Sequence, residues 1–289
     1  MSKIEEALRR AHTERTGRAA VGEVPPPSKP RPVVGRARKL STDKQLVGLT
    51  AAEEIAHMRE PFTRSRSDLL ARRIIDKDAV DSPVADAFRH LRTRLFRQAG
   101  DRNFVLLVTS AAADGGGSFV ARNLAAAIAF DAGHTALLLD CNLREPSLDE
   151  LLEAPDEAPG LTDFLAGEED KVENIIHPVG IPRMRLVPVG RQPRSAMEYF
   201  TTPRLGQLIG ELKTRYRERY IVIDAPPISE AADARILAEL CDYGLLVVPY
   251  GRVTTSQVAT AAAAIGEERF AGCVLNNEPP MPGFGRVAG

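Results

Sequence analysis

The stretch "VTSAAADGGGSFVARNLA", residues 108–125, carries the strongest signal for the fold of this chain. It begins at the end of an apolar run, passes through the glycines of Gly115–Gly117, and continues with apolar residues at helical spacing. A strand that turns sharply into a helix through glycine is a building unit of parallel sheets. The stretch therefore predicts a β-strand, a tight turn and an α-helix.

Strand-like and helix-like segments alternate around this stretch. The expected strands are Phe104–Thr109, Thr135–Asp140, Met184–Val189, Tyr220–Asp224, Gly244–Pro249 and Cys273–Asn276. Helical patterns fall at 84–99, 118–132, 203–218, 231–241 and 254–268. Continuous apolar strands that alternate with helices indicate a mostly parallel sheet with helices on both faces. We therefore expect an α/β fold.

The composition of the chain argues against a nucleic-acid partner and against a membrane span. The chain has 289 residues, of which 44% are hydrophobic and 27% charged, and its formal net charge is −1. This balance is ordinary for a globular protein and gives no reason to expect a nucleic-acid partner. The sequence contains no apolar run of about 18 residues, so we expect no membrane span. Any role at a membrane would come through a partner.

Four regions are expected along the chain. Residues 1–16 read as an amphipathic helix that opens with a capping box, Ser2 and Glu5; it is either a frayed end or a docking helix that folds on a partner. Residues 17–80, with "GEVPPPSKPRPVVGRARK", read as a flexible basic linker with weak helix near its end. The linker is either a solvated tether or a contact for an anionic membrane surface. The α/β domain is expected at 82–277, and a flexible tail at 278–289.

The glycine-rich turn resembles a Walker A loop, G-x-x-x-x-G-K-[ST], whose backbone N–H groups cradle phosphates. Gly116 and Ser118 stand where the second glycine and the Mg²⁺-binding hydroxyl belong, and Gly117 stands in place of the lysine. Gly115, Phe119 and these three residues form the candidate nucleotide-binding set. Taken alone, the match leaves a nucleotide site, a remnant of one and a plain turn all open.

Two acids strengthen the nucleotide interpretation. Asp140 ends the strand in "ALLLDCNLREPSL", and Asp224 ends the strand in "RYIVIDAPP". Ligands of α/β sheets bind outside the carboxyl ends of the strands, so the two acids and the loop are expected to meet in one crevice. Carboxylates placed there can hold Mg²⁺, and each acid by itself would otherwise be read as a strand-end cap.

Several segments together resemble one family. "LLLDCNLREPSL", "GLTDFLAG", "LVPVG", "YIVIDAPPISEAADARILAELCDYGLLVV" and "GCVLN" occur in the order seen in bacterial-type protein tyrosine kinases, the CpsD/CapB-like branch of P-loop ATPases. The resemblance covers roughly residues 82–277. The opening "MSKIEEALRRA" and Phe119 are most similar to members associated with exosortase-type exopolysaccharide clusters.

The resemblance implies a P-loop NTPase-like fold, the use of ATP and Mg²⁺, and a role in exopolysaccharide or capsule synthesis and export. It implies catalytic roles for Asp140 and Asp224, and Mg²⁺ ligation by these acids together with Ser118. It also implies a membrane polysaccharide co-polymerase, or chain-length protein, as partner. The expected location is the cytoplasm, free or held at the inner membrane through that partner.

The family's ring-forming motif, E-x-x-R-x-x-R, falls on Asp86, Arg89 and Arg92, with Asp in place of Glu. Side chains at this spacing lie along one flank of a helix and can reach the acids of a neighbouring copy. The resemblance therefore implies self-association into a ring. Without it, these residues would be read as a solvated helix face.

Three departures from the family pattern weaken the expectation of catalysis. Gly117 removes the lysine beside the transferred phosphoryl group, and losing one such donor costs about 3–4 kcal/mol of transition-state stabilisation. Asn142 replaces the second acid of the D-x-D motif, and the last tyrosine is Tyr250, so no C-terminal tyrosine cluster follows it. Asp114 adds a negative charge to the loop. Arg122, one turn into the helix, either lends its charge to the site or faces solvent or a neighbouring segment.

Three functional hypotheses follow from the sequence. The favoured one is a catalytically weak or inactive kinase-like protein, a pseudokinase with degenerate ATP binding, that acts as a partner in polysaccharide export. The alternative is an active ATP-dependent tyrosine autokinase that regulates polysaccharide chain length. The third, a MinD/ParA-type ATPase switch, is disfavoured because "DCNLREP" follows the kinase pattern.

Overall fold

The computed structural model of the protein describes residues 58, 60–79, 82–152, 158–191, 196–215 and 218–279. The expected docking helix at 1–16 lies outside the described residues, as do most of the expected linker and nearly all of the expected tail. Within the described part of the chain, no helix combines the length and apolar character needed to cross a membrane.

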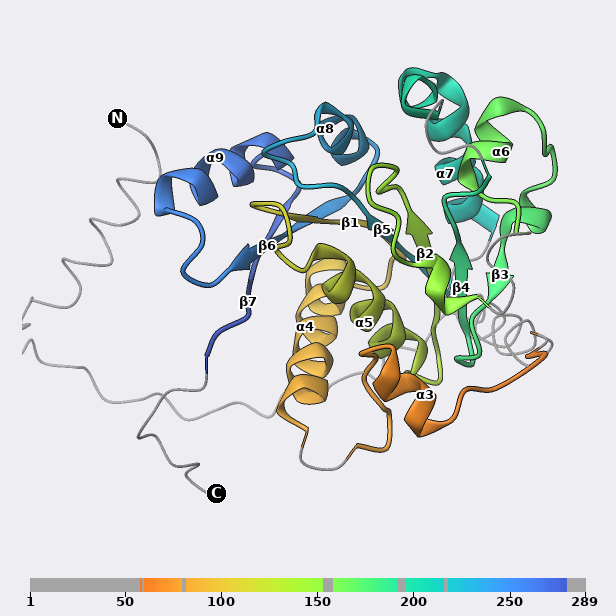
Figure 1. The fold of residues 1–289 in the computed structure, drawn as a ribbon, viewed down its shortest axis with the longest axis horizontal. Coiled ribbons are helices and arrows are strands. Elements are labelled where there is room, and N and C mark those ends of the chain that lie inside the picture. The colour runs from red at the N-terminus through yellow and green to blue at the C-terminus, as the bar shows by residue number, and fades with distance from the viewer. Residues whose placement is uncertain are drawn as a thin grey trace, which may run out of the picture. The chain divides into compact units, whose positions relative to one another are not determined.

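The described chain is a seven-stranded sheet with helices on both faces (Figure 1). The strands are β1 (Val105–Ser110), β2 (Thr135–Asp140), β3 (His177–Pro178), β4 (Met184–Val187), β5 (Arg219–Asp224), β6 (Tyr243–Pro249) and β7 (Phe270–Asn276). The α-helices are α3 (Arg66–Ala71), α4 (Pro83–Ala99), α5 (Gly117–Ala129), α6 (Leu161–Ala166), α7 (Pro203–Arg215), α8 (Ala232–Glu239) and α9 (Thr255–Ile265). Short 3₁₀ turns lie at Asp149–Leu151, Val172–Ile175 and Ala196–Thr201.

The strand order is β3-β4-β2-β5-β1-β6-β7, and every neighbouring pair is parallel except β3–β4. β1, the strand that enters the glycine-rich turn, lies near the middle of the sheet between β5 and β6. The expected mostly parallel α/β fold is confirmed. The antiparallel edge strand β3 and helix α6 were not predicted.

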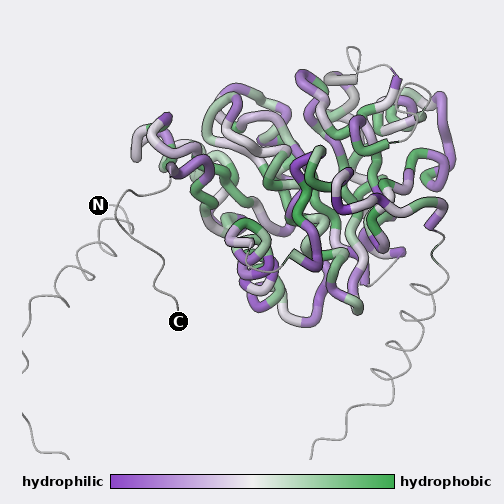
Figure 2. The backbone as a smooth tube through the Cα atoms, turned by 60° about the horizontal axis from the view of Figure 1, so that its bottom comes forward, coloured by the Kyte–Doolittle hydropathy of each residue, from purple (hydrophilic) through white to green (hydrophobic). Residues whose placement is uncertain are grey.

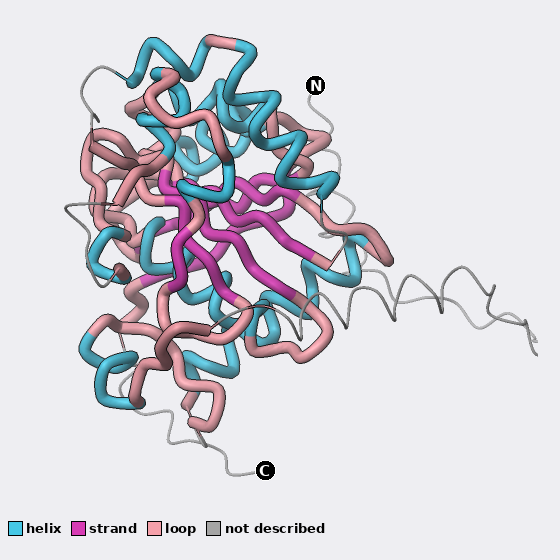
Figure 3. The backbone as a smooth tube through the Cα atoms, turned by 90° about the vertical axis from the view of Figure 1, so that its right-hand side faces the viewer, coloured by secondary structure: helices cyan, strands magenta, loops and turns pink. Residues whose placement is uncertain are grey.

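Two apolar layers hold the helices to the sheet. One layer joins the sheet to α3, α4 and α5, and the other joins it to α6, α7, α8 and α9. Successive residues of β1 serve the two layers alternately: Leu106 and Val108 pack with α4 and α5, and Val105 and Leu107 pack on the opposite side. The strands therefore run as a hydrophobic band through the middle of the molecule, with helices on either side (Figures 2 and 3).

Residues 60–79 differ from the expected flexible linker. Leu69, Ile74 and Ile75 are buried in the same layer as α4 and α5. The Arg64 guanidinium donates to the carbonyl of Val179 at 2.8 Å and to that of Leu151 at 2.7 Å. The packed domain thus begins before residue 82, although the weak helix expected in this region is present as α3.

Candidate functional site

The glycine-rich loop, residues 111–117, joins β1 to α5 and ends in a left-handed turn. Gly116 is the N-cap of α5 with φ 86° and ψ 26°, and Asp114 also has a positive φ, 51°. Aspartate tolerates this region better than most residues, and glycine adopts it freely. A Cβ atom at Gly116 would also collide with the side-chain amide of Asn276. The loop therefore requires glycine at position 116.

Side chains from distant segments donate hydrogen bonds to the loop carbonyls. The Arg252 guanidinium donates to the carbonyls of Ala113 and Asp114 at 3.1 and 2.9 Å. The Asn276 amide donates to the Gly115 carbonyl at 3.0 Å. Within the described part of the chain, the backbone N–H groups of Gly115 to Phe119 have no hydrogen-bond acceptor. These N–H groups and the N-terminus of α5 form an arrangement that suits an anion.

The two strand-end acids are neighbours. Asp140 ends β2 and Asp224 ends β5, and the parallel register pairs these two residues directly. Both are fully buried at the carboxyl edge of the sheet, where β1 delivers the glycine-rich loop. The structure thus brings the predicted acids together beside the predicted loop, as parallel topology requires.

Burial perturbs both acids. It raises the pKa of Asp224 to about 7, against lowering effects from the Ser118 hydroxyl and the Arg122 cation. Burial, reinforced by the charge of Asp224, raises the pKa of Asp140 well above its usual range. Two carboxylates that share a dry site resist ionising together. The acid pair, Asp140 and Asp224, is therefore expected to retain a proton near neutral pH when no cation is bound.

The acid pair has the donor atoms for a divalent cation. In the described structure both carboxylate oxygens of Asp224 and Oδ2 of Asp140 are buried without a hydrogen bond of ordinary geometry. Buried oxygens in this state are costly unless something neutralises them. Together with the Ser118 hydroxyl they fit Mg²⁺, which prefers oxygen ligands. No group of three or more His, Cys, Asp or Glu side chains is placed to hold a metal within the described ranges.

Gly117 leaves space beside the acid pair. A Cβ atom built on Gly117 would lie 3.9 Å from Oδ1 of Asp224 and 3.8 Å from the Ser110 nitrogen, which are ordinary contacts. The φ of Gly117 is not positive, so its backbone accepts any side chain. A side chain can therefore begin at this position without backbone strain or a Cβ clash, although in this chain the position supplies no charge.

Arg122 does not replace the missing lysine. Its guanidinium forms an ion pair with Glu150 and donates to the Arg72 carbonyl at 3.2 Å. Of the arrangements expected for this residue, contact with a neighbouring segment is the one observed. Its charge reaches Asp224 only as a lowering influence on that pKa.

Two further site residues have mainly structural contacts. The Phe119 ring packs edge-on against Phe88, with ring centroids 5.9 Å apart, so only the backbone of Phe119 faces the candidate anion site. The backbone N–H of Asn142 donates to Oδ1 of Asp140 at 3.0 Å. Asn142 thus orients the first acid, but its amide adds no negative charge.

The expected ring-forming residues contact their own chain. Arg89 forms an ion pair with Asp86 at 2.6 Å and donates to the Lys77 carbonyl. Arg92 donates to the Ala127 carbonyl at 2.9 Å and lies 3.7 Å from a carboxylate oxygen of Asp131. Ring formation through these residues stays a prediction. Arg92 in particular would have to give up its hydrogen bond to the Ala127 carbonyl in order to contact a second copy of the chain.

Sequence reasoning missed the residues that support the loop. Arg252 follows β6 and Asn276 ends β7, so both reach the loop only because β6 lies beside β1 and β7 lies beside β6. Glu230 accepts from the Ala113 N–H at 3.1 Å. The one available signal was the position of Asn276, a polar residue at the end of an apolar strand.

A cavity of about 370 Å³ adjoins the loop on the side of α8 and α9. Its walls are Ala111 and Ala112 of the loop, Ser229, Glu230 and Arg235 near α8, and Ser256, Gln257 and Thr260 of α9, with Ile228, Ala261 and Ala264. The lining therefore mixes apolar side chains with hydroxyl, amide and charged groups.

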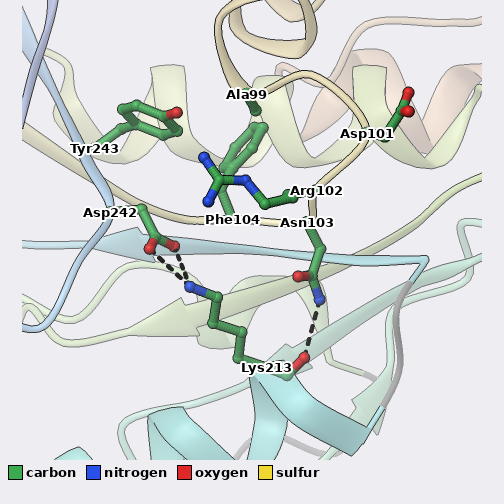
Figure 4. A pocket seen from close by; sticks show the side chains of 8 residues that line it. All are labelled: Ala99, Asp101, Arg102, Asn103, Phe104, Lys213, Asp242 and Tyr243. Carbon is green, nitrogen blue, oxygen red and sulfur yellow. Dashed lines mark hydrogen bonds and ion pairs between the residues drawn. The ribbon is translucent and has the colours of Figure 1, made fainter.

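A second cavity, of about 350 Å³, lies at the amino ends of β1 and β6, opposite the glycine-rich loop (Figure 4). There Asp242 accepts from the Val105 N–H at 2.8 Å and pairs with Lys213 at 2.7 Å. Asn103 donates to the Lys213 carbonyl at 2.9 Å. These bonds join the amino end of β1 to α7, so this cavity is separate from the loop and the acid pair.

Comparison with known proteins agrees with this geometry. No family model matches the chain. The chain is 30% identical over 207 residues to the tyrosine-protein kinase CpsD of Streptococcus agalactiae. The aligned region covers 69% of this chain and 87% of CpsD. The chain is 33% identical over 198 residues to a Ralstonia solanacearum protein named EpsB, which covers 68% of this chain; the chain spans only 25% of the length of EpsB.

The fold comparison points the same way. The kinase domain of the Escherichia coli tyrosine kinase ETK superposes with a TM-score of 0.64 and 27% identity, over 74% of this chain and 85% of that domain. This chain has the fold of a P-loop protein and is similar to CpsD over most of the length of CpsD, and both findings indicate the same family. The chain belongs to the bacterial tyrosine-protein kinases.

Proposed function

We propose that this protein is a kinase-like partner in exopolysaccharide or capsule synthesis and export that binds MgATP weakly and transfers phosphate slowly or not at all. Its partner is a membrane polysaccharide co-polymerase, which would hold it at the inner membrane from the cytoplasmic side. The observation that carries the proposal is Gly117, which lies beside Asp224 where the family pattern has a lysine.

The backbone of the site supports nucleotide binding. Arg252 and Asn276 donate to the loop carbonyls, and the N-terminus of α5 presents N–H groups that have no acceptor among the described residues. The acid pair and Ser118 suit Mg²⁺, which would bring positive charge to a bound triphosphate. Binding is therefore expected to depend on Mg²⁺, since Asp114 and the acid pair would otherwise repel the phosphates.

The charges of the site support weak catalysis. Phosphoryl transfer depends on fixed positive groups aimed at the charge of the transition state. Gly117 supplies none, and Arg122 is paired with Glu150. One lost donor of this kind corresponds to roughly 10²–10³ in rate.

One observation favours the alternative, an active autokinase. Arg252 is exposed and already contacts the loop at Ala113 and Asp114. A rotation of this side chain would carry a guanidinium toward bound phosphate. In that case Arg252 would take over the role of the lysine, and the Arg252→Ala variant would lose activity.

The test is a phosphotyrosine assay on the full chain with MgATP. The variants are Gly117→Lys, which restores the charge, and Gly117→Met, which matches its length without the charge. Asp224→Ala removes an acid that either reading needs. We expect no phosphotyrosine in the wild type or in Gly117→Met. A signal in Gly117→Lys that Asp224→Ala removes would show that only the cation is missing.

A strong wild-type signal would overturn the proposal, provided that Asp224→Ala abolishes it. If Arg252→Ala abolishes it as well, the autokinase reading is correct and Arg252 supplies the charge. The partner is tested separately, by co-purification with a co-polymerase encoded beside the gene. Failure to co-purify would contradict that half of the proposal.

A further inference from the structure

The two edges of the sheet are built differently. β3 is two residues long and contains a proline, Pro178, so it offers little to a passing strand. β7 at the other edge has seven residues, FAGCVLN, with no charge and no proline. Proteins usually blunt a free edge with charge, proline or a short strand. β7 has none of these three protections, and its one irregularity lies near Gly272, before its last four residues.

The backbone of β7 presents hydrogen-bonding groups to its free side. The Tyr250 N–H donates to the Asn276 carbonyl at 2.8 Å, so the groups of Asn276 face β6. Backbone direction alternates along a strand, and the register is regular after an irregularity near Gly272. The N–H and C=O groups of Cys273 and Leu275 therefore point away from β6. No described strand pairs with this side of β7.

The side chains of the same two residues are also exposed. Val274 packs toward the layer of α4 and α5, so Cys273 and Leu275 face the opposite side of the sheet. Leu275 is 52% exposed, and Cys273 is exposed as well. Apolar side chains and unpaired backbone groups thus coincide on one edge.

A second copy of β7 suits this edge. Two identical strands related by a two-fold axis pair antiparallel, and each then satisfies the other's outward groups. Since β7 has no charged residue, the pairing opposes no like charges. The chain's own residues after 279 suit it less well, because Pro280 and Pro282 lack an N–H.

We propose that two copies of this protein associate through antiparallel pairing of β7 with β7, which continues the sheet from one copy into the other. The two-fold axis passes close to Cys273 or Val274, so the two Cys273 side chains lie opposite or diagonal on one face. Their separation is then about 5–8 Å between Cα atoms. The pairing would also steady Asn276, whose amide supports the glycine-rich loop.

The test combines sedimentation with cross-linking of the full chain. The weight-average mass of the wild type is expected to rise toward twice the chain mass of 31.4 kDa between about 1 and 100 µM. Cys273→Pro removes an outward N–H that β6 does not use, and Leu275→Lys places charge on the edge. Both variants are expected to stay monomeric. Leu275 is exposed, so its variant is expected to fold even if the proline variant does not.

A short bismaleimide provides the second readout. It is expected to join two wild-type copies through Cys273, because Cys141 and Cys241 are buried. The matched control is Ser67→Cys in a Cys273→Ser background, which moves the exposed thiol to α3. Cross-linking at Cys273 should be at least tenfold faster than at the control position. A monomer at every concentration, an assembly unchanged in both edge variants, or equal cross-linking rates would overturn the proposal.

Discussion

Asp224→Asn is expected to remove a pH-dependent loss of stability. The folded pKa of Asp224 is raised from 3.8 to about 7, chiefly by burial. Protonated Asp224 therefore favours the folded state, and this contribution is complete below pH 3.8 and lost as the pH rises to about 7. Each pH unit in the middle of this window costs about 1.4 kcal/mol and the slope flattens near pH 7, so the wild type loses about 2 kcal/mol between pH 5 and pH 7. The asparagine variant keeps the shape of the side chain and cannot ionise.

The assay is urea unfolding of wild type and variant at pH 5, 6, 7 and 8. The stability of the variant relative to the wild type should increase by about 2 kcal/mol from pH 5 to pH 7 and then level off. Glu145→Gln, a neutralisation of an exposed acid on the segment after β2, serves as control and should show no such trend. If the stability of wild type and of Asp224→Asn changed with pH in the same way, the reasoning that burial raises the pKa of Asp224 would be refuted.

Magnesium provides a second arm of the same experiment. A cation held by the acid pair stabilises the ionised form, so Mg²⁺ should raise the stability of the wild type most at pH 8. The same addition should do little for Asp224→Asn, which has lost one carboxylate. An equal gain in both proteins would mean that Mg²⁺ acts elsewhere.

Four further substitutions test the packing of the loop and of α4. Gly116→Ala should destabilise the protein by about 1–3 kcal/mol in thermal unfolding, because the new Cβ meets Asn276 and the φ is positive; an unchanged melting temperature would contradict this geometry. Asn276→Ala frees the Gly115 carbonyl and should increase amide hydrogen exchange in the loop, with no change expected in β2. Arg92→Glu should lower the free energy of unfolding by about 1–3 kcal/mol because it breaks the hydrogen bond to the Ala127 carbonyl. Arg89→Glu, at a more exposed position, should lower it by less than about 1 kcal/mol. Similar losses for the two variants in chemical unfolding would argue against the internal role of Arg92.

The sheet could be predicted because its strands are continuous apolar runs, and the expected order of strands and helices is the observed one. What was missed has little periodic signal. β3 has two residues, one of them Pro178, and α6 is a single short helix between Gly160 and Gly167. Leu69, Ile74 and Ile75 lie among charged residues, so sequence alone gave no sign that residues 60–79 pack on the domain.

Part of the candidate site could be predicted from the sequence and part could not. Asp140 and Asp224 could be placed together because both end parallel strands, and the loop follows a third strand. The loop supports could not be foreseen, since Arg252 lies well over a hundred residues from Asp114 in sequence. The inward turn of Arg92 was equally hidden, because helical spacing alone does not distinguish a flank that faces solvent from one that contacts α5.

The central claim is that the site keeps the frame for a triphosphate and lacks one cation. The most direct test is calorimetric titration of MgATP into the wild type, Gly117→Lys and Gly117→Met. A hydrogen bond to a charged group is worth about 1.5–3 kcal/mol, so the lysine variant should bind about 10- to 100-fold more tightly than the other two. The same affinity for the lysine and methionine variants would contradict the account, because the loop beside Asp224 would then not be a triphosphate site that a single charge completes.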